Sequence, residues 1–139
     1  MRGYIWLLLS MLATGCGPGK PKEPFSQLAS EFVYTSLSFS PVNATASGYH
    51  RHQQLKLDEM LDDLSPAGLD RQRQFYRTFR ERLARSVKPE DLAPDDRADY
   101  DILTDQIALA LLELDEIQSW RHNPTVYVEL VGNALFQPH

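Results

Sequence analysis

Apolar residues recur at steps of three and four along most of the chain after residue 24, the spacing of a helix that buries one face. The first such stretch begins at Phe25 and ends before Pro41, because the residue preceding a proline is pushed out of the helical region. Ser26 is a suitable capping residue at its start. The pattern predicts a helix over about 26–39, and its buried face comprises Phe25, Leu28, Phe32 and Leu37.

A second helix is predicted between Ser65-Pro66 and Lys88-Pro89. Serine caps a helix well, and proline suits the first helical position, where its missing N–H would have no partner. Arginines occupy much of the remaining surface, and those near the end suit the negative end of the helix dipole. The predicted apolar face comprises Leu69, Gln72, Tyr76, Phe79 and Leu83.

A third helix is predicted from Pro94 to about Trp120, and Asn123-Pro124 ends it. Its apolar positions cover more than a stripe, which is typical of a helix buried between neighbours. The short link over 88–94 predicts an antiparallel hairpin with the Arg-rich second helix. Acidic residues on the third helix either pair with those arginines or form a separate solvated face. The apolar residues are Leu103, Ile107, Ala110, Leu114 and Ile117, with Leu109, Leu111 and Leu112 beside them.

The segment from Thr125 to Val131 permits either a strand or a helix. Its β-branched residues suit a strand, but a lone strand would leave its backbone groups unpaired. A fourth helix starting at Pro124 is therefore the preferred prediction. The fold class is all-α: three to four helices in an antiparallel hairpin or bundle, within one domain over 25–139. Tyr76, Phe79, Tyr100 and Trp120 are expected to pack in its core.

The N-terminus predicts export. Arg2 precedes an uncharged apolar run over 4–13, about half of the ~20 residues needed to span a bilayer, as in a signal peptide. Leu12-Ala13-Thr14-Gly15-Cys16 resembles the lipobox of bacterial lipoproteins. These features predict a signal peptide over 1–16, lipid attachment at Cys16, a flexible tether over 17–24 and a location on the cell envelope. In a Gram-negative host this would be the outer membrane or the periplasmic face. Ordinary secretion with cleavage elsewhere is the alternative.

Composition and motifs limit the chemistry. A net charge of −5 without a dense basic stretch argues against a nucleic-acid partner, and Cys16 is the only cysteine, so no disulfide can form within the chain. His50 and His52 form an H-x-H pair that either contributes to a metal site or is solvated. Asp58, Glu59, Asp62 and Asp63 lack the spacing and glycine of a calcium loop and are interpreted as a polar stretch leading to the Ser65 cap. The zinc-protease signature His-Glu-x-x-His does not occur, and the sequence contains no complete catalytic site.

Several ordered motifs resemble the N-terminal part of the bacterial domain of unknown function 885 (DUF885) proteins. They are Phe25-x-x-Leu28-x-x-x-Phe32, Pro41-Val42-Asn43-Ala44-Thr45-x-x-Gly48-x-His50, Leu61-Asp62-Asp63-Leu64-Ser65, Asp99-Tyr100-Asp101-x-Leu103 and Trp120-x-x-Asn123-Pro124-x-x-Tyr127. The resemblance spans essentially all of 25–136. It implies a larger, mostly helical protein similar to gluzincin metallopeptidases, whose zinc helix lies downstream. These N-terminal helices would border a substrate cleft, with His50 and His52 as candidate residues of a loop at that cleft.

Two functional hypotheses follow. In the first, the chain is the N-terminal helical segment of an exported zinc-metallopeptidase-like lipoprotein, truncated and catalytically incomplete on its own. No cofactor is then expected in this chain, zinc is expected in full-length relatives, and a peptide substrate only in a full-length form. In the second, the chain is a self-contained small envelope lipoprotein that acts as a helical interaction module. Under both, the membrane is a partner through the lipid, the apolar helix faces favour self-association, and the isolated product is marginally stable.

Overall fold

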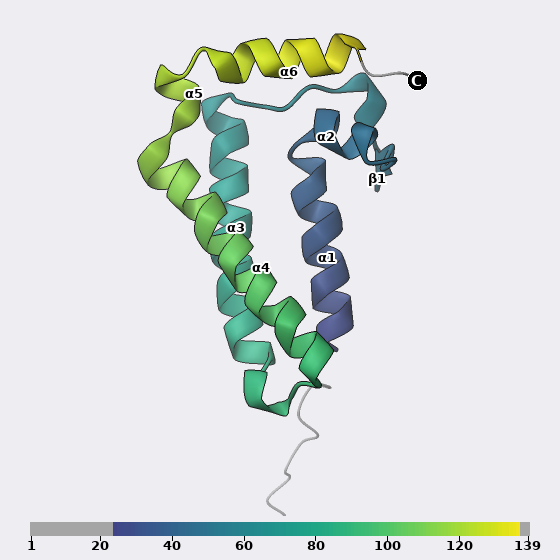
Figure 1. Ribbon diagram of the computed structural model, residues 1–139, viewed down its shortest axis with the longest axis vertical. Coiled ribbons are helices and arrows are strands. Elements are labelled where there is room, and N and C mark those ends of the chain that lie inside the picture. The colour runs from purple at the N-terminus through teal and green to yellow at the C-terminus, as the bar shows by residue number, and fades with distance from the viewer. Residues whose placement is uncertain (1–23, 137–139) are drawn as a thin grey trace, which may run out of the picture.

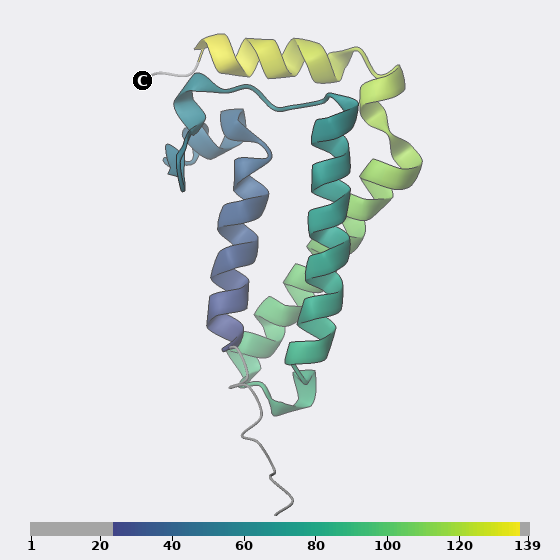
Figure 2. The ribbon, with the colours of Figure 1, turned by 180° about the vertical axis from the view of Figure 1, so that it is seen from behind.

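A computed structural model describes residues 24–136 and shows two long helices side by side, a third that crosses them obliquely and a fourth that lies across one end (Figure 1). The long helices are α1 (Phe25–Ser38), α3 (Pro66–Ser86) and α4 (Pro94–Leu112), and the helix across one end is α6 (Thr125–Phe136). The view from behind shows the same arrangement (Figure 2). The predicted all-α fold is confirmed. No helix in the described range has both the length and the apolar character needed to cross a bilayer.

Short elements connect the long helices. They are α2 (Pro41–Ala46), β1 (Arg51–His52), β2 (Leu55–Lys56), the 3₁₀ turns η1 (Leu57–Glu59) and η2 (Pro89–Asp91), the π-helical η3 (Glu113–Ile117) and α5 (Ser119–His122). The strands β1 and β2 form one small antiparallel hairpin, in which Arg51 pairs with Lys56. The sequence analysis missed α2 and the hairpin because each is too short to show a periodic pattern.

The core lies where α1, α3 and α4 meet. Most of it comes from the predicted faces of the three helices: Phe25, Leu28, Phe32, Phe79, Leu83, Leu103, Ile107 and Leu111 are all buried. Leu109 and Leu112, which were expected to widen the buried face of α4, are exposed, because no neighbouring element of the described range covers that side of the helix. Phe32 is central, because its ring lies 5.3 Å from that of Phe79 and 6.2 Å from those of Phe75 and Tyr76. Aromatic pairs at these separations stabilise a core beyond the area that they bury.

The corner between α1 and α2 depends on a proline and a glycine. Helix α1 ends before Pro41, as predicted, and Pro41 then occupies the first turn of α2. At the far end of α2, Gly48 has a φ of +80°, the left-handed conformation that favours glycine. The N–H groups of Gly48 and Tyr49 donate to the carbonyls of Thr45 and Ala44, respectively. This is a Schellman termination, which turns the chain toward β1.

The third helix ends earlier than predicted. Regular α-helix stops at Leu112, and a π-helical turn follows in which the N–H of Gln118 donates to the carbonyl of Glu113 over 2.8 Å. Gln118 itself is left-handed, with a φ of 52°, and it separates η3 from α5. The wider turn rotates the apolar face, so that Leu114 is buried whereas Ile117 is exposed. The prediction of one continuous helix to Trp120 was therefore wrong.

Helix α6 confirms that Thr125 to Val131 is helical. It presents apolar side chains to solvent, with exposed fractions of 70% for Val128, 73% for Leu135 and 86% for Phe136. Tyr127 and Val131 are also exposed. The outward side of this helix is thus more apolar than a solvated helix surface usually is.

Candidate functional site

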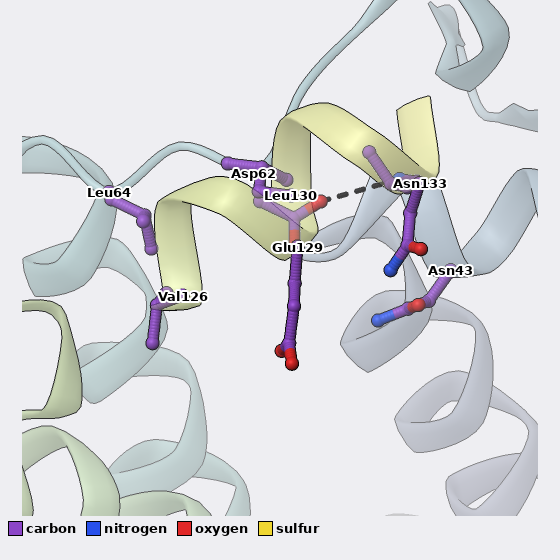
Figure 3. Close-up of a pocket in the computed structure, with 8 residues that line it drawn as sticks. Asn43, Asp62, Leu64, Val126, Glu129, Leu130 and Asn133 are labelled. Carbon is purple, nitrogen blue, oxygen red and sulfur yellow. Dashed lines mark hydrogen bonds between the residues drawn. The ribbon is translucent and has the colours of Figure 1, made fainter. Parts of the chain in front are cut away.

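Part of the described surface is hollowed under α6. One cavity of about 170 Å³ lies between α6, α2 and the loop that precedes α3. Figure 3 shows Glu129 pointing from α6 into this space, with the amides of Asn43 and Asn133 beside it. The full lining comprises Val42, Asn43, Asp62, Leu64, Val126, Glu129, Leu130 and Asn133.

The polar groups around this cavity differ in how many of their hydrogen-bonding positions are already used. Asn43 uses its amide N–H to donate to the Ser40 hydroxyl over 2.9 Å, which leaves its carbonyl oxygen available. Glu129 is exposed on α6, and its carboxylate has no side-chain partner within the described residues. A carboxylate that points into a hollow beside two amides favours a ligand with N–H donors or positive charge.

Asp62 is a structural residue of this wall. Its carboxylate accepts from the Ser40 hydroxyl at 2.6 Å and from the backbone N–H of Val42 at 3.3 Å. Ser40 is the residue before α2, so Asp62 caps that helix from a distant part of the sequence. Such a cap satisfies N–H groups that have no partner inside the helix.

A second, larger cavity of about 290 Å³ lies beside the first and is mostly apolar. Tyr76 from α3 and Trp120 from α5 contribute its aromatic walls, and burial raises the pKa of the Tyr76 hydroxyl. Its other lining residues are Leu64, Leu69, Gln72, Ala110, Glu113, Leu114, Ser119 and Val126. Three of the four aromatic residues predicted to pack in the core do so: Phe79 lies within it, and Tyr76 and Tyr100 pack against it, the latter beside Phe25. Trp120 instead lines this cavity.

Arg73 lies behind the second cavity and holds Leu114, one of its lining residues, in place. Its guanidinium donates to the backbone carbonyl of Leu114 at 2.8 Å and to the Asp115 carboxylate at 3.1 Å. The same group lies 5.9 Å from the centre of the Trp120 ring. Asp115 also accepts from Arg77 at 2.8 Å. The sequence left open whether the arginines pair with the acidic residues or face solvent separately. At η3 they pair, because the Asp115 carboxylate accepts from both Arg73 and Arg77.

The two histidines lie on and beside β1, away from α6. His50 Nδ1 lies 2.8 Å from Asp58, which also accepts from the Thr45 hydroxyl at 2.9 Å. His52 Nδ1 lies 2.9 Å from the hydroxyl of Tyr49. The two rings therefore have different partners, and the structure does not bring them together with a third ligand within 24–136.

The acidic residues of the 58–63 stretch also have different hydrogen-bond partners and do not form one cluster within the described residues. Glu59 accepts from Lys56 at 2.8 Å, and Asp63 accepts from the Ser65 N–H at 3.0 Å and from Arg71 at 2.6 Å. Hydrogen bonds from Ser65, and then the nearby Arg71 guanidinium, hold the pKa of Asp63 below its usual value. Ser65 accepts in turn from the Gly68 N–H at 3.1 Å. The predicted cap of α3 is confirmed.

The comparison with protein families supplies an assignment. The family described as "Bacterial protein of unknown function (DUF885)" matches residues 41–138, which is more than half of the chain. This chain belongs to the DUF885 family. The match begins at Pro41, so the motif over Phe25 to Phe32 lies outside it, although the resemblance was expected from Phe25 onward. No curated protein and no solved structure matches the chain.

The DUF885 motifs of this chain mainly build its corners. In the last of them, the Asn123 side chain accepts from the Thr125 N–H at 3.1 Å, and the Tyr127 hydroxyl donates to the carbonyl of Trp120 at 2.7 Å. These bonds set the turn from α5 into α6. Sequence reasoning missed Glu129 and Asn133, because one acid and one amide on an apolar helix form no recognisable spacing. The one signal in the sequence is their spacing of four residues, which places Glu129 and Asn133 on the same side of a helix.

The predicted lipid attachment at Cys16, the signal peptide over 1–16 and nearly all of the tether over 17–24 lie outside the described residues. The same applies to the last three residues, 137–139. Lipidation and the envelope location therefore stay predictions from the sequence.

Proposed function

We propose that this DUF885 chain is the N-terminal helical segment of an exported zinc-metallopeptidase-like lipoprotein and is catalytically incomplete on its own. The observation that carries the proposal is the outward face of α6, where Val128, Val131 and Leu135 are exposed. Exposed apolar rows of this kind mark surfaces that contact another protein or a membrane. Ile102, Leu109 and Leu112 extend apolar exposure along α4.

The geometry favours a protein as the partner of α6. Helix α1 begins at the end of the bundle opposite α6 (Figure 1). Helix α3 has 21 residues, so the two ends are separated by about 30 Å at 1.5 Å per residue. A lipid at Cys16 would hold the α1 end near the membrane and α6 away from it. The apolar face of α6 would then meet further polypeptide rather than the anchoring bilayer.

The described residues do not fit a zinc ion. No three His, Cys, Asp or Glu side chains gather within 24–136, and Asp58 and Tyr49 engage the two histidines of the H-x-H pair separately. Zinc, where the proposed protein uses it, would be held by residues beyond this range, and no reaction step is assigned to the helices described here. Their role is to form and support one wall of a cleft.

The DNA that follows the codon for His139 tests the proposal. A continuation or frameshifted remainder that encodes His-Glu-x-x-His supports it. A stop codon followed by an unrelated gene contradicts it and favours the second candidate, a self-contained envelope lipoprotein that uses the α6 face to bind another protein or a second copy. That candidate is supported by the same exposed residues.

Two assays on the protein complete the test. We expect metabolic labelling with a radioactive fatty acid to mark the wild-type chain and not Cys16→Ser, because only the thiol can form the thioether. Equal labelling of both chains would contradict lipidation at Cys16. We expect no peptide hydrolysis by the isolated chain with added zinc, and zinc-dependent hydrolysis would overturn the proposal.

A further inference from the structure

Three neighbouring cavities lie under α6, and we refer to this row of cavities as the groove. The apolar cavity and the cavity around Glu129 share Leu64 and Val126 as lining residues. A third cavity of about 280 Å³ lies toward the C-terminal end of α6 and shares Val42 with the cavity around Glu129. The groove therefore runs along the underside of the helix, from Trp120 at one end to Leu135 at the other.

The lining of this groove has only one sign of charge. Glu113, Asp62, Glu129, Asp58 and Glu59 contribute to the three cavities, whereas no lysine or arginine does. Four of these acids are already engaged: Asp62, Asp58 and Glu59 by the contacts described above, and Glu113 by accepting from the Ser119 N–H at 2.8 Å. Glu129 is the acid whose side chain extends into the groove (Figure 3).

The two halves of the groove favour different chemical groups. The half walled by Tyr76, Trp120 and Leu114 is large enough for one apolar side chain and is lined mostly by carbon. The half around Glu129, Asn43 and Asn133 offers a carboxylate and two amides. Leu64 and Val126 lie between the halves, so the apolar and the polar groups of a ligand must be close neighbours. A charge-assisted hydrogen bond to a cation would satisfy Glu129.

We propose that the groove under α6 binds a peptide segment in which a large apolar side chain is followed closely by a lysine or arginine. The apolar side chain enters the cavity beside Trp120, and the cationic group contacts Glu129 next to the two asparagine amides. This inference goes beyond the proposed function, since it requires only residues of this chain and holds whether or not a peptidase region follows. The acidic lining supplies the charge complementarity that selects this class of partner.

Trp120 provides a direct readout. The sequence has two tryptophans, Trp6 and Trp120, so the full chain carrying Trp6→Phe reports on the groove alone. The probe is an acetylated and amidated hexapeptide, free of tryptophan, with one leucine followed by one lysine. We expect a saturable change in Trp120 fluorescence with this peptide. Replacing its lysine by glutamate should weaken binding by about tenfold or more, because Glu129 then meets a like charge.

Matched variants separate the two halves of the groove. Glu129→Gln keeps the shape of the side chain and should weaken binding of the lysine peptide about fivefold and reduce the salt dependence of its affinity. Glu81→Gln, at an exposed site on α3 outside the groove, should leave the affinity unchanged. Ala110→Leu fills the apolar cavity and should abolish the fluorescence change, with circular dichroism confirming that the helices remain.

Three results would overturn the proposal: no saturable signal from the wild-type groove, equal affinity for the lysine and glutamate peptides, or an unchanged affinity in Glu129→Gln. None of them bears on the DNA that follows His139. Failure of peptide binding is therefore distinguishable from failure of the proposed function.

Discussion

The carboxylate of Asp62 accepts a 2.6 Å hydrogen bond from the hydroxyl of Ser40, 22 residues earlier in the chain. Through this contact and the N–H of Val42, one side chain joins the loop before α3 to the start of α2. The loop also forms the floor of the groove under α6. Loss of this contact should therefore affect both the fold and the groove.

We expect Asp62→Ala to lower the free energy of unfolding by about 1–2 kcal/mol, since the Ser40 hydroxyl and the Val42 N–H both lose their acceptor. Urea denaturation followed by circular dichroism measures the change. Asp105→Ala, at an exposed site on α4, is the control and should stay within about 0.5 kcal/mol of wild type. Equal stability of the two variants would show that the cap contributes nothing.

Substituting alanine for two of the glycines should change the stability of the fold in opposite directions. A Cβ at Gly68 would lie 2.4 Å from the backbone oxygen of Asp63, whereas one at Gly132 would meet nothing within 4 Å. We expect Gly68→Ala to destabilise the protein by about 1–3 kcal/mol through overpacking. Gly132→Ala in α6 should stabilise it by about 0.5–1 kcal/mol, because alanine is the better helix former. Thermal melts compare the two, and a stabilised Gly68→Ala would contradict this packing.

Arg73 should couple energetically to Asp115. Its side chain is 22% exposed and bonds to both Asp115 and the Leu114 carbonyl. We expect Arg73→Ala to cost about 1–3 kcal/mol, and Arg73→Lys to recover only part of this because lysine lacks the planar fork. A double-mutant cycle with Asp115→Ala measures the coupling. Arg80→Ala, at an exposed site on α3, is the control. If the free-energy changes of Arg73→Ala and Asp115→Ala simply add up in the double variant, the two residues act independently.

Acid should weaken the fold through Asp63 and Asp115. The Arg77 guanidinium, with Arg73, holds the pKa of Asp115 below its usual 3.8, and Ser65 with Arg71 does the same for Asp63. In the unfolded chain these carboxylates bind protons at a higher pH than in the folded chain. Their contribution to the stability of the fold is therefore complete above about pH 3.8. It is lost as the pH falls through the lower folded values.

The urea midpoint of the wild type should consequently fall between about pH 6 and about pH 3, and it should fall less in Asp115→Asn and Asp63→Asn. Asp105→Asn serves as the reference for a carboxylate without these partners. A wild-type midpoint that rises on acidification would contradict the direction of both pKa shifts.

The long helices could be predicted from the sequence because each buries one periodic face. Phe25, Leu28 and Phe32 line up on α1 as their spacing requires, and Ser65 caps α3 as its position before Pro66 suggests. The end of α4 could not be predicted in this way. A single widened turn at Glu113–Ile117 and a left-handed Gln118 leave no mark on apolar periodicity.

The groove could not be predicted from the sequence for a related reason. It forms only after Asp62, Asn43 and Glu129 come together from three separate segments. Tertiary contacts of this kind follow from how α6 crosses the bundle, and no local pattern specifies that crossing. The motif from Trp120 to Tyr127, which indicated the family, forms the corner between α5 and α6 but does not by itself reveal where α6 then lies.

The exposed apolar face of α6 should require a partner. Sedimentation velocity, with thermal melts on the same samples, measures this on the chain without residues 1–16, because the apolar run in those residues would itself associate. We expect concentration-dependent association and a broad melt for the wild type, and a monomer with unchanged helix content for the double variant Val128→Gln and Leu135→Gln. A wild-type chain that remains monomeric on concentration and melts in one sharp transition would contradict it.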